Sequence, residues 1–192
     1  MSLTVKVAYP RGPQANIASV LVALPKRMPS RLSTLVHACL AAVFDANPLA
    51  CPSTSRVGVV TVRTPVLPGK LTGPAIFVSH GGAAFPDLDL VLSGDNVTVI
   101  LVGNTNISKG ITTSDFAALP DVPVSSFEVK LPTGPNSALA VYGNVCKQRL
   151  LMPTTITAQN GKAIRQNTKI SVSGCPAKHK RRHKRRSPRR RR

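Results

Sequence analysis

Residues 87–103 read DLDLVLSGDNVTVILVG, and this stretch indicates which kind of fold the chain forms. Apolar and polar side chains alternate along 88–92 and again along 97–102, which is the period of a β-strand with one buried face. The Gly-Asp-Asn triplet at 94–96 separates the two runs, and residues of these types favour tight turns. The stretch therefore predicts a β-hairpin.

The same alternation recurs along most of the chain. Seventeen prolines and thirteen glycines indicate many turns and few long helices. Aromatic residues make up only 4% and Trp is absent, so the core must be built of Val, Leu, Ile and Ala. Many short strands separated by turns predict an all-β sandwich. Further strands are expected at Val5 and Val7, 17–24, 57–62, 75–78, 127–131, 154–157 and 170–172.

One segment has a helical pattern instead. The run PSRLSTLVHACLAAVFDANP, residues 29–48, carries a rough apolar stripe at helical spacing. Ser30 can cap its start, and Asn47-Pro48 can end it. We therefore expect one short helix over about residues 30–46, and a further short helical turn at 112–119.

Two parts of the chain resemble each other. The stretches IASVLVALPKRMPSRLSTLVHAC (17–39) and VSSFEVKLPTGPNSALAVYGNVC (124–146) align without a gap at an offset of 107 residues. Their shared apolar positions, Leu-Pro pair and final cysteine indicate a duplication, because self-similarity at a fixed spacing marks a repeated structural unit. We therefore expect two tandem sandwich-like (Ig-like) units, residues 1–84 and 85–176, followed by a basic tail, residues 177–192.

The second unit has a strand at its front, DLDLVLSG (87–94), with no counterpart ahead of the first unit. The chain opens with MSLTVKVAYP, which lacks the basic and long apolar parts of a signal peptide. We expect this sequence to be the C-terminal part of a longer repeat protein, or to have a misplaced start. The alternative is a diverged first unit that never had the strand. No run reaches the roughly 18 apolar residues of a membrane-spanning helix.

The four cysteines, Cys39, Cys51, Cys146 and Cys175, form no CxxC pair. Cys39 and Cys51 bracket the end of the predicted helix, and Cys146 and Cys175 flank the last strands, so we expect disulfides within these two pairs. Loop closure would contribute about 3 and about 3.5 kcal/mol. Three connectivities are possible; free buried thiols, or a zinc site of His37 with Cys39 and Cys51, are alternatives. Disulfides indicate an oxidising compartment.

The stretch FVSHGGAAFPDLDL, residues 77–90, is the most enzyme-like part of the chain. His80 stands on a Gly-rich turn with Asp87 and Asp89 nearby, and a histidine with carboxylates can transfer protons. Alternation puts both carboxylates on one face of a strand, which we expect to be solvent-exposed. We therefore favour a solvated loop over a catalytic or Ca²⁺-binding site, and expect no cofactor, no metal and no enzymatic activity.

The chain ends KHKRRHKRRSPRRRR (178–192), which holds eleven Lys or Arg and no acid. The other 177 residues carry fifteen Lys or Arg against seven acids. Like charges repel, so we expect a disordered tail. It would bind polyanions by releasing their counterions, and without interleaved aromatics it would not stack on bases. The predicted polyanion-binding residues are Lys178, Lys180, Arg181, Arg182, Lys184, Arg185, Arg186, Arg189, Arg190, Arg191 and Arg192.

The phrases PDVPVSSF (120–127), GPNSALA (134–140) and MPTTITAQNG (152–161) resemble uncharacterised repeat-bearing secreted or cell-surface proteins of high-GC Gram-positive bacteria. The resemblance covers nearly all of residues 3–175. It implies export, since such proteins tend to be longer, with N-terminal signal sequences and Lys/Arg/His-rich C-terminal tails. This sequence departs from them by lacking the N-terminal part. The family has no assigned activity, so no functional residue is carried over.

Together these features predict a non-enzymatic, exported or surface-associated protein with a structural or adhesion-like role. Its tail would hold an anionic cell-envelope polymer or anionic lipid headgroups, and no small-molecule substrate is expected. One alternative is a nucleic-acid-binding protein that uses the same tail. Another is a carbohydrate-binding or polysaccharide-active module. A concave face carrying Asp87, Asp89 and Asp121 together would favour that module, because sugar hydrolysis usually needs two opposed acids.

Overall fold

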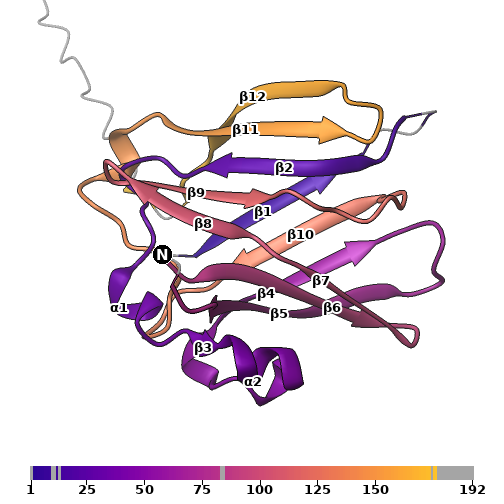
Figure 1. Cartoon of the computed structure of the whole chain (residues 1–192). Helices are drawn as coiled ribbons and strands as arrows, with labels where there is room; N and C mark the ends of the chain where they lie inside the picture. Colours follow the sequence, from indigo (N-terminus) through magenta and orange to yellow (C-terminus); the bar gives the residue numbers. More distant parts are fainter. Residues whose placement is uncertain (1, 10–11, 13, 83–84, 174, 177–192) are drawn as a thin grey trace, which may run out of the picture.

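The computed structural model describes residues 2–9, 12, 14–82, 85–173 and 175–176, and shows two β-sheets packed as a sandwich (Figure 1). The large sheet runs β1 (Leu3–Ala8), β10 (Ser126–Leu131), β4 (Arg56–Arg63), β5 (Lys70–Ser79), β6 (Asp87–Gly94) and β7 (Val97–Leu101), with β3 (Cys39–Leu40) paired to β5. The small sheet runs β12 (Ala163–Ile170), β11 (Leu150–Ala158), β2 (Ile17–Ala23), β9 (Ile111–Phe116) and β8 (Asn104–Ser108). The all-β class predicted from the sequence is confirmed.

The hairpin predicted at residues 87–103 forms as β6 and β7. Leu90 lies opposite Leu101, and Gly94 lies opposite Val97. Asp95 and Asn96 connect the strands with φ of 49° and 59°. This is the left-handed region that a two-residue hairpin turn requires, and Asp and Asn tolerate it better than most other residues.

The main core lies between the two sheets and is almost wholly aliphatic. It is formed by side chains on the inner faces of the sheets, since successive residues of a strand point to opposite faces. Removing such side chains from water is the largest favourable contribution to folding, at about 1.5–3 kcal/mol for each large one. The buried members are Leu3, Met28, Leu35, Val57, Val60, Val62, Leu71, Ala75, Phe77, Leu90, Leu92, Val129, Leu131, Ala138, Leu139 and Leu150.

The two predicted tandem units are matched only loosely, because strands from both halves of the chain alternate within each sheet. In the large sheet, β10 of the second half lies between β1 and β4 of the first. In the small sheet, β2 of the first half lies between β11 and β9 of the second. Both halves therefore share one sandwich, and the boundary at residue 84 stays a prediction. The predicted tail, residues 177–192, lies outside the described residues.

The single helix predicted over about residues 30–46 is wrong. Two short helices form instead, α1 (Leu32–Leu35) and α2 (Ala41–Ala46), separated by β3. Cys39 and Leu40 pair in parallel with Val78 and Ser79 of β5, so the backbone at Leu40 is extended, with φ −71° and ψ 139°. A long-range pairing thus outweighs the local helical pattern. The 3₁₀ turns η1 (Pro48–Ala50) and η2 (Ser53–Ser55) follow, and among the described residues no helix is long and apolar enough to cross a membrane.

The start of this segment also differs from expectation. Arg31, not Ser30, occupies the N-cap position of α1, and no side chain caps that helix. The Ser30 N–H instead donates to the hydroxyl of Thr112 at 3.0 Å, and Ser30 forms an isolated bridge with Leu139. These bonds hold the loop before α1 to the second half of the chain.

The helical turn predicted at residues 112–119 is wrong, because most of this stretch belongs to β9. Lys109 and Gly110, with φ of 51° and 74°, make a tight turn that pairs β9 with β8, a strand that the alternation did not predict. The strand expected at 170–172 lies earlier, as β12, because the turn at Gly161, with φ of 78°, follows β11 directly. In both segments, the turn that starts a hairpin therefore determined where the strand lies.

Candidate functional site

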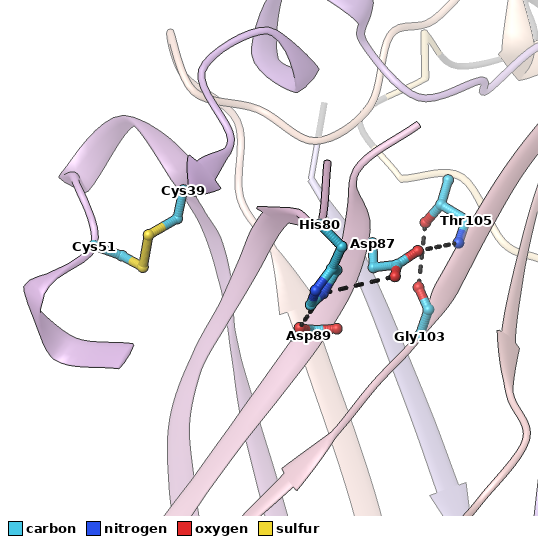
Figure 2. A network of polar contacts seen from close by, with 7 residues as sticks. All are labelled: Cys39, Cys51, His80, Asp87, Asp89, Gly103 and Thr105. Atoms are coloured by element: carbon cyan, nitrogen blue, oxygen red, sulfur yellow. Dashed lines mark hydrogen bonds and ion pairs between the residues drawn. A yellow bond between two sulfur atoms is a disulfide. The ribbon is translucent and has the colours of Figure 1, made fainter. Parts of the chain in front are cut away.

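Both predicted disulfides are present. Cys39 and Cys51 are joined with a Cα–Cα distance of 5.4 Å, and Cys146 and Cys175 with one of 5.6 Å. All four cysteines are therefore paired, which leaves no thiolate for the zinc site considered with His37. Figure 2 shows the first disulfide close to the polar cluster described below.

The Cys39–Cys51 disulfide anchors a covering segment, residues 39–55, on the outer face of the large sheet. Both sulfur-bearing residues are almost fully buried, at 1% and 2% exposure. With Phe44 of α2 they pack against outward-facing side chains of β5 and β6, forming a second, smaller core. The sheet residues in this core are Ile76, Val78 and Val91.

A polar cluster lies on the same outer face, beside the covering segment. His80 Nε2 is 3.6 Å from an oxygen of Asp89 and 3.8 Å from an oxygen of Asp87, and Figure 2 shows the imidazole directed toward both carboxylates. The two carboxylates share one face of β6, as predicted. The expectation that this face is solvated is wrong, since the side chain of Asp89 is 0% exposed and that of Asp87 13%.

Burial of Asp89 follows from its place in the register. It lies opposite Ile76 and two residues from Val91 on the same face, and both of these side chains belong to the smaller core. The face is therefore closed by residues that are distant in sequence. Neither carboxylate oxygen of Asp89 has a hydrogen bond in the described part of the chain.

This environment raises the pKa of Asp89 to about 6. Burial is the main cause, because the charged carboxylate loses its hydration. The charge of His80 opposes the rise, as does the backbone N–H of Gly103, which points toward the carboxylate without meeting full hydrogen-bond geometry. The charge of Asp87 adds to the rise. Asp89 is therefore a buried acid that can hold a proton near neutral pH.

The other two members of the cluster are held differently. The carboxylate of Asp87 accepts a hydrogen bond from the backbone N–H of Thr105 at 2.9 Å. His80 directly follows β5, precedes Gly81 and Gly82 with φ of 61° and 75°, and its side chain is 36% exposed. His80 thus connects the buried acid to solvent.

The cluster has the chemistry of proton sharing between His80 and Asp89. In the described part of the chain, His80 makes ion-pair contacts with carboxylates and no hydrogen bond to a Ser, Thr or Cys side chain. No group of three or more His, Cys, Asp or Glu side chains among these residues is arranged to hold a metal ion. Asp121 does not join the cluster, since its contact is a hydrogen bond from the amide of Asn16 at 2.8 Å.

The predicted polyanion-binding residues of the tail, Lys178 to Arg192, lie outside the described residues. The nearest described feature is the Cys146–Cys175 disulfide, which attaches the chain just before the tail to η3 (Val145–Lys147). Sequence reasoning missed two exposed cations of β12, Arg165 and Lys169. The signal that could have found them is the absence of any Asp or Glu after Glu128.

No family model matches the chain, and no curated protein or solved structure matches it either.

Proposed function

We propose that this protein is an exported, non-enzymatic β-sandwich with a structural or adhesion-like role, and that its basic tail holds an anionic polymer of the cell envelope. One observation carries the proposal: eleven of the last fifteen residues are Lys or Arg, and none is acidic. Such a segment binds linear polyanions through counterion release, with little preference for sequence.

The two disulfides support the exported location. Disulfides persist in oxidising compartments and are rare where glutathione keeps thiols reduced. Both pairs have Cα–Cα separations within the range that native disulfides adopt. Nucleic acid is the competing partner, because its phosphates also attract the tail, and it would be favoured by a reducing cytosol.

Two features support a non-enzymatic role. The most enzyme-like residues, His80 and Asp89, contact each other and the covered face of a sheet. The carboxylates considered for sugar hydrolysis divide between this cluster and the Asn16–Asp121 contact, so they do not form the opposed pair that this chemistry needs.

The location is tested by counting thiols on protein from its native host. The protein is alkylated without reductant, and its intact mass is measured. We expect no alkylation, since all four cysteines are paired. Four alkylated thiols would contradict export and favour nucleic acid as the partner.

The role of the tail is tested with a full-length variant in which its eleven Lys and Arg are replaced by Gln. Binding to inorganic polyphosphate is measured over a series of NaCl concentrations. We expect much weaker binding and a shallower dependence of log K on log[salt], because each phosphate contact contributes about 0.7 to that slope for a single strand. Unchanged affinity and slope would contradict the proposal.

A further inference from the structure

The β11–β12 hairpin forms the outermost pair of strands of the small sheet (Figure 1). It carries exposed cations along its length and at both ends. We name these residues the hairpin strip: Lys147, Arg149, Lys162, Arg165 and Lys169.

The register places the two strand members of the strip on the outer face. Met152 and Thr154 are buried and lie opposite Thr168 and Gln166. The intervening residues of β12 therefore point away from the core, since side chains alternate along a strand. Arg165 and Lys169, which are four residues apart, share this outer face.

The strip follows β12 from one end to the other. Lys162 lies just before the strand, and Arg149 precedes Leu150, which lies opposite the last residue of β12, Ile170. The eight steps of extended chain from residue 162 to residue 170, at about 3.4 Å each, span about 27 Å. The cations therefore form a row suited to a linear ligand rather than to a single small anion.

No acidic side chain of the described residues forms an ion pair with a cation of this row. The last acid in the chain is Glu128, and no member of the strip forms a salt bridge within the described ranges. Across the sheet, Arg165 lies opposite Thr155, Thr155 opposite Leu21, and Leu21 opposite Asp115, which is the first acid along this row. Three strand spacings separate these charges, about 14 Å, so the strip keeps its positive potential.

One end of the strip is linked by a disulfide to the residues just before the tail. Cys146 immediately precedes Lys147, and its disulfide to Cys175 fixes the chain at the point where the described residues end. A polymer held by the tail at this point lies beside Lys147 and Arg149. Charges on a rigid strand lose less conformational freedom on binding than charges on a flexible segment.

We propose that the hairpin strip is a second polyanion-binding surface, which receives the same linear anionic polymer as the tail. This inference rests on the proposed function and deepens it. The partner is a chain of phosphodiester or carboxylate groups outside the cell, recognised by its backbone charge. Residues 143–192 contain no Phe, Tyr or Trp, so the strip itself offers none of these rings for stacking on nucleobases.

The test uses full-length chains and inorganic polyphosphate as the probe. The strip variant is Arg165→Gln with Lys169→Gln. The matched control, Lys70→Gln with Lys109→Asn, removes the same charge from β5 and from the β8–β9 turn, and Asn suits the positive φ of residue 109. Circular dichroism and thiol counts confirm that all variants keep the fold and both disulfides.

We expect the strip variant to bind polyphosphate about tenfold more weakly at low salt, because two basic contacts to the polymer are lost. Its salt slope should fall by about 1.4, the value for two lost contacts. The control should stay within about twofold of wild type. Equal weakening of the strip and control variants would overturn the inference, since net charge alone would then explain binding.

The tail variant separates the two proposals. If it retains polyphosphate binding that the strip substitutions then abolish, the strip is a site of its own. If it loses all binding, the strip inference fails while the proposed function stands. If the tail variant binds like wild type and the strip variant does not, the proposed function fails and the strip remains. Tighter binding of single-stranded DNA than of polyphosphate of equal charge would overturn the assigned partner.

Discussion

Two regions on the outer face of the large sheet each carry a carboxylate, and they shift its pKa in opposite directions. Over β5 and β6, the covering segment closes the face, and burial raises the pKa of Asp89 to about 6. Over β1 and β10 the side chain of Glu128 is 27% exposed, and it contacts Lys6 at 3.2 Å and Lys130 at 3.0 Å. There the pKa of Glu128 is lowered, mainly by its hydrogen bond to Lys130.

The comparison shows that the cover, rather than the strand, decides the state of a charge on this sheet. Both carboxylates stand at outward positions of alternating strands and neighbour core residues in sequence. The side chain of Glu128 stays 27% exposed and lies beside two cations, whose effect outweighs that of its partial burial. Asp89 loses its hydration and faces His80 and Asp87, and His80 and the backbone N–H of Gly103 compensate for this loss only in part. Three predictions test this difference.

The largest effect is expected from removing the cover. Cys39→Ala with Cys51→Ala opens the loop that anchors the segment and leaves space in the smaller core. We expect a loss of about 4 kcal/mol of unfolding free energy, which adds lost packing to about 3 kcal/mol of loop closure. Urea denaturation measures the loss.

The matched control is Cys146→Ala with Cys175→Ala. It opens a longer loop, with a sequence separation of 29 against 12, but its cysteines lie outside the two buried cores. Loop closure alone would make its removal the costlier of the two, at about 3.5 kcal/mol. A larger loss for the control would show that burial under the covering segment contributes little.

The second effect concerns Asp89 and pH. The pKa of Asp89 in the folded state, about 6, exceeds its ordinary value of 3.8, so between these pH values the folded state holds a proton that the unfolded state has released. The contribution of Asp89 to the free energy of unfolding is therefore largest below about pH 4 and falls as the pH rises toward 6. The upper bound is about 3 kcal/mol, from 1.36 kcal/mol for each pKa unit.

Asp89→Asn removes this titration and keeps the shape of the side chain. We expect the variant to be more stable than wild type at pH 7 by about 2 kcal/mol, and to approach wild type near pH 4. Urea denaturation at both pH values measures the difference. A gap that is equal at both pH values would mean that Asp89 does not titrate in this range.

The smallest effect concerns Glu128. Its lysine partners are largely exposed, with side chains 70% and 65% accessible, so solvent screens both contacts. Lys130→Gln should raise the pKa of Glu128 toward its ordinary value, and Lys6→Gln should raise it less, because Lys130 is the main cause of the shift. Carboxyl chemical shifts in an NMR titration measure this. A larger change on removing Lys6 would reverse the assignment.

Much of the fold could be predicted because its signals are local. Alternation found β6 and β7, and the Gly-Asp-Asn turn found their connection. The sequence also predicted both disulfides. The helix over about residues 30–46 could not be predicted correctly, since its interruption at Cys39 comes from pairing with β5, almost forty residues along the chain.

The candidate site divides in the same way. Alternation correctly placed Asp87 and Asp89 on one face of β6. The Gly-rich turn correctly indicated that His80 lies near both carboxylates. Solvation of that face was predicted wrongly, because a strand pattern records which residues share a face and not what lies above it. Arg165 and Lys169 were not predicted as binding residues, because the tail holds far more positive charge and dominates the composition.

The sequence by itself determined the all-β class, the turn between β6 and β7, the cysteine pairs and the concentration of positive charge at the C-terminal end. These depend on side-chain period, backbone preference and composition, which act over a few residues. The tertiary structure alone decided that both halves share one sandwich, that residues 39–55 cover the sheet, and that Asp89 is buried beside His80. These depend on which distant segments pack together, and burial of a charge is a property of that packing.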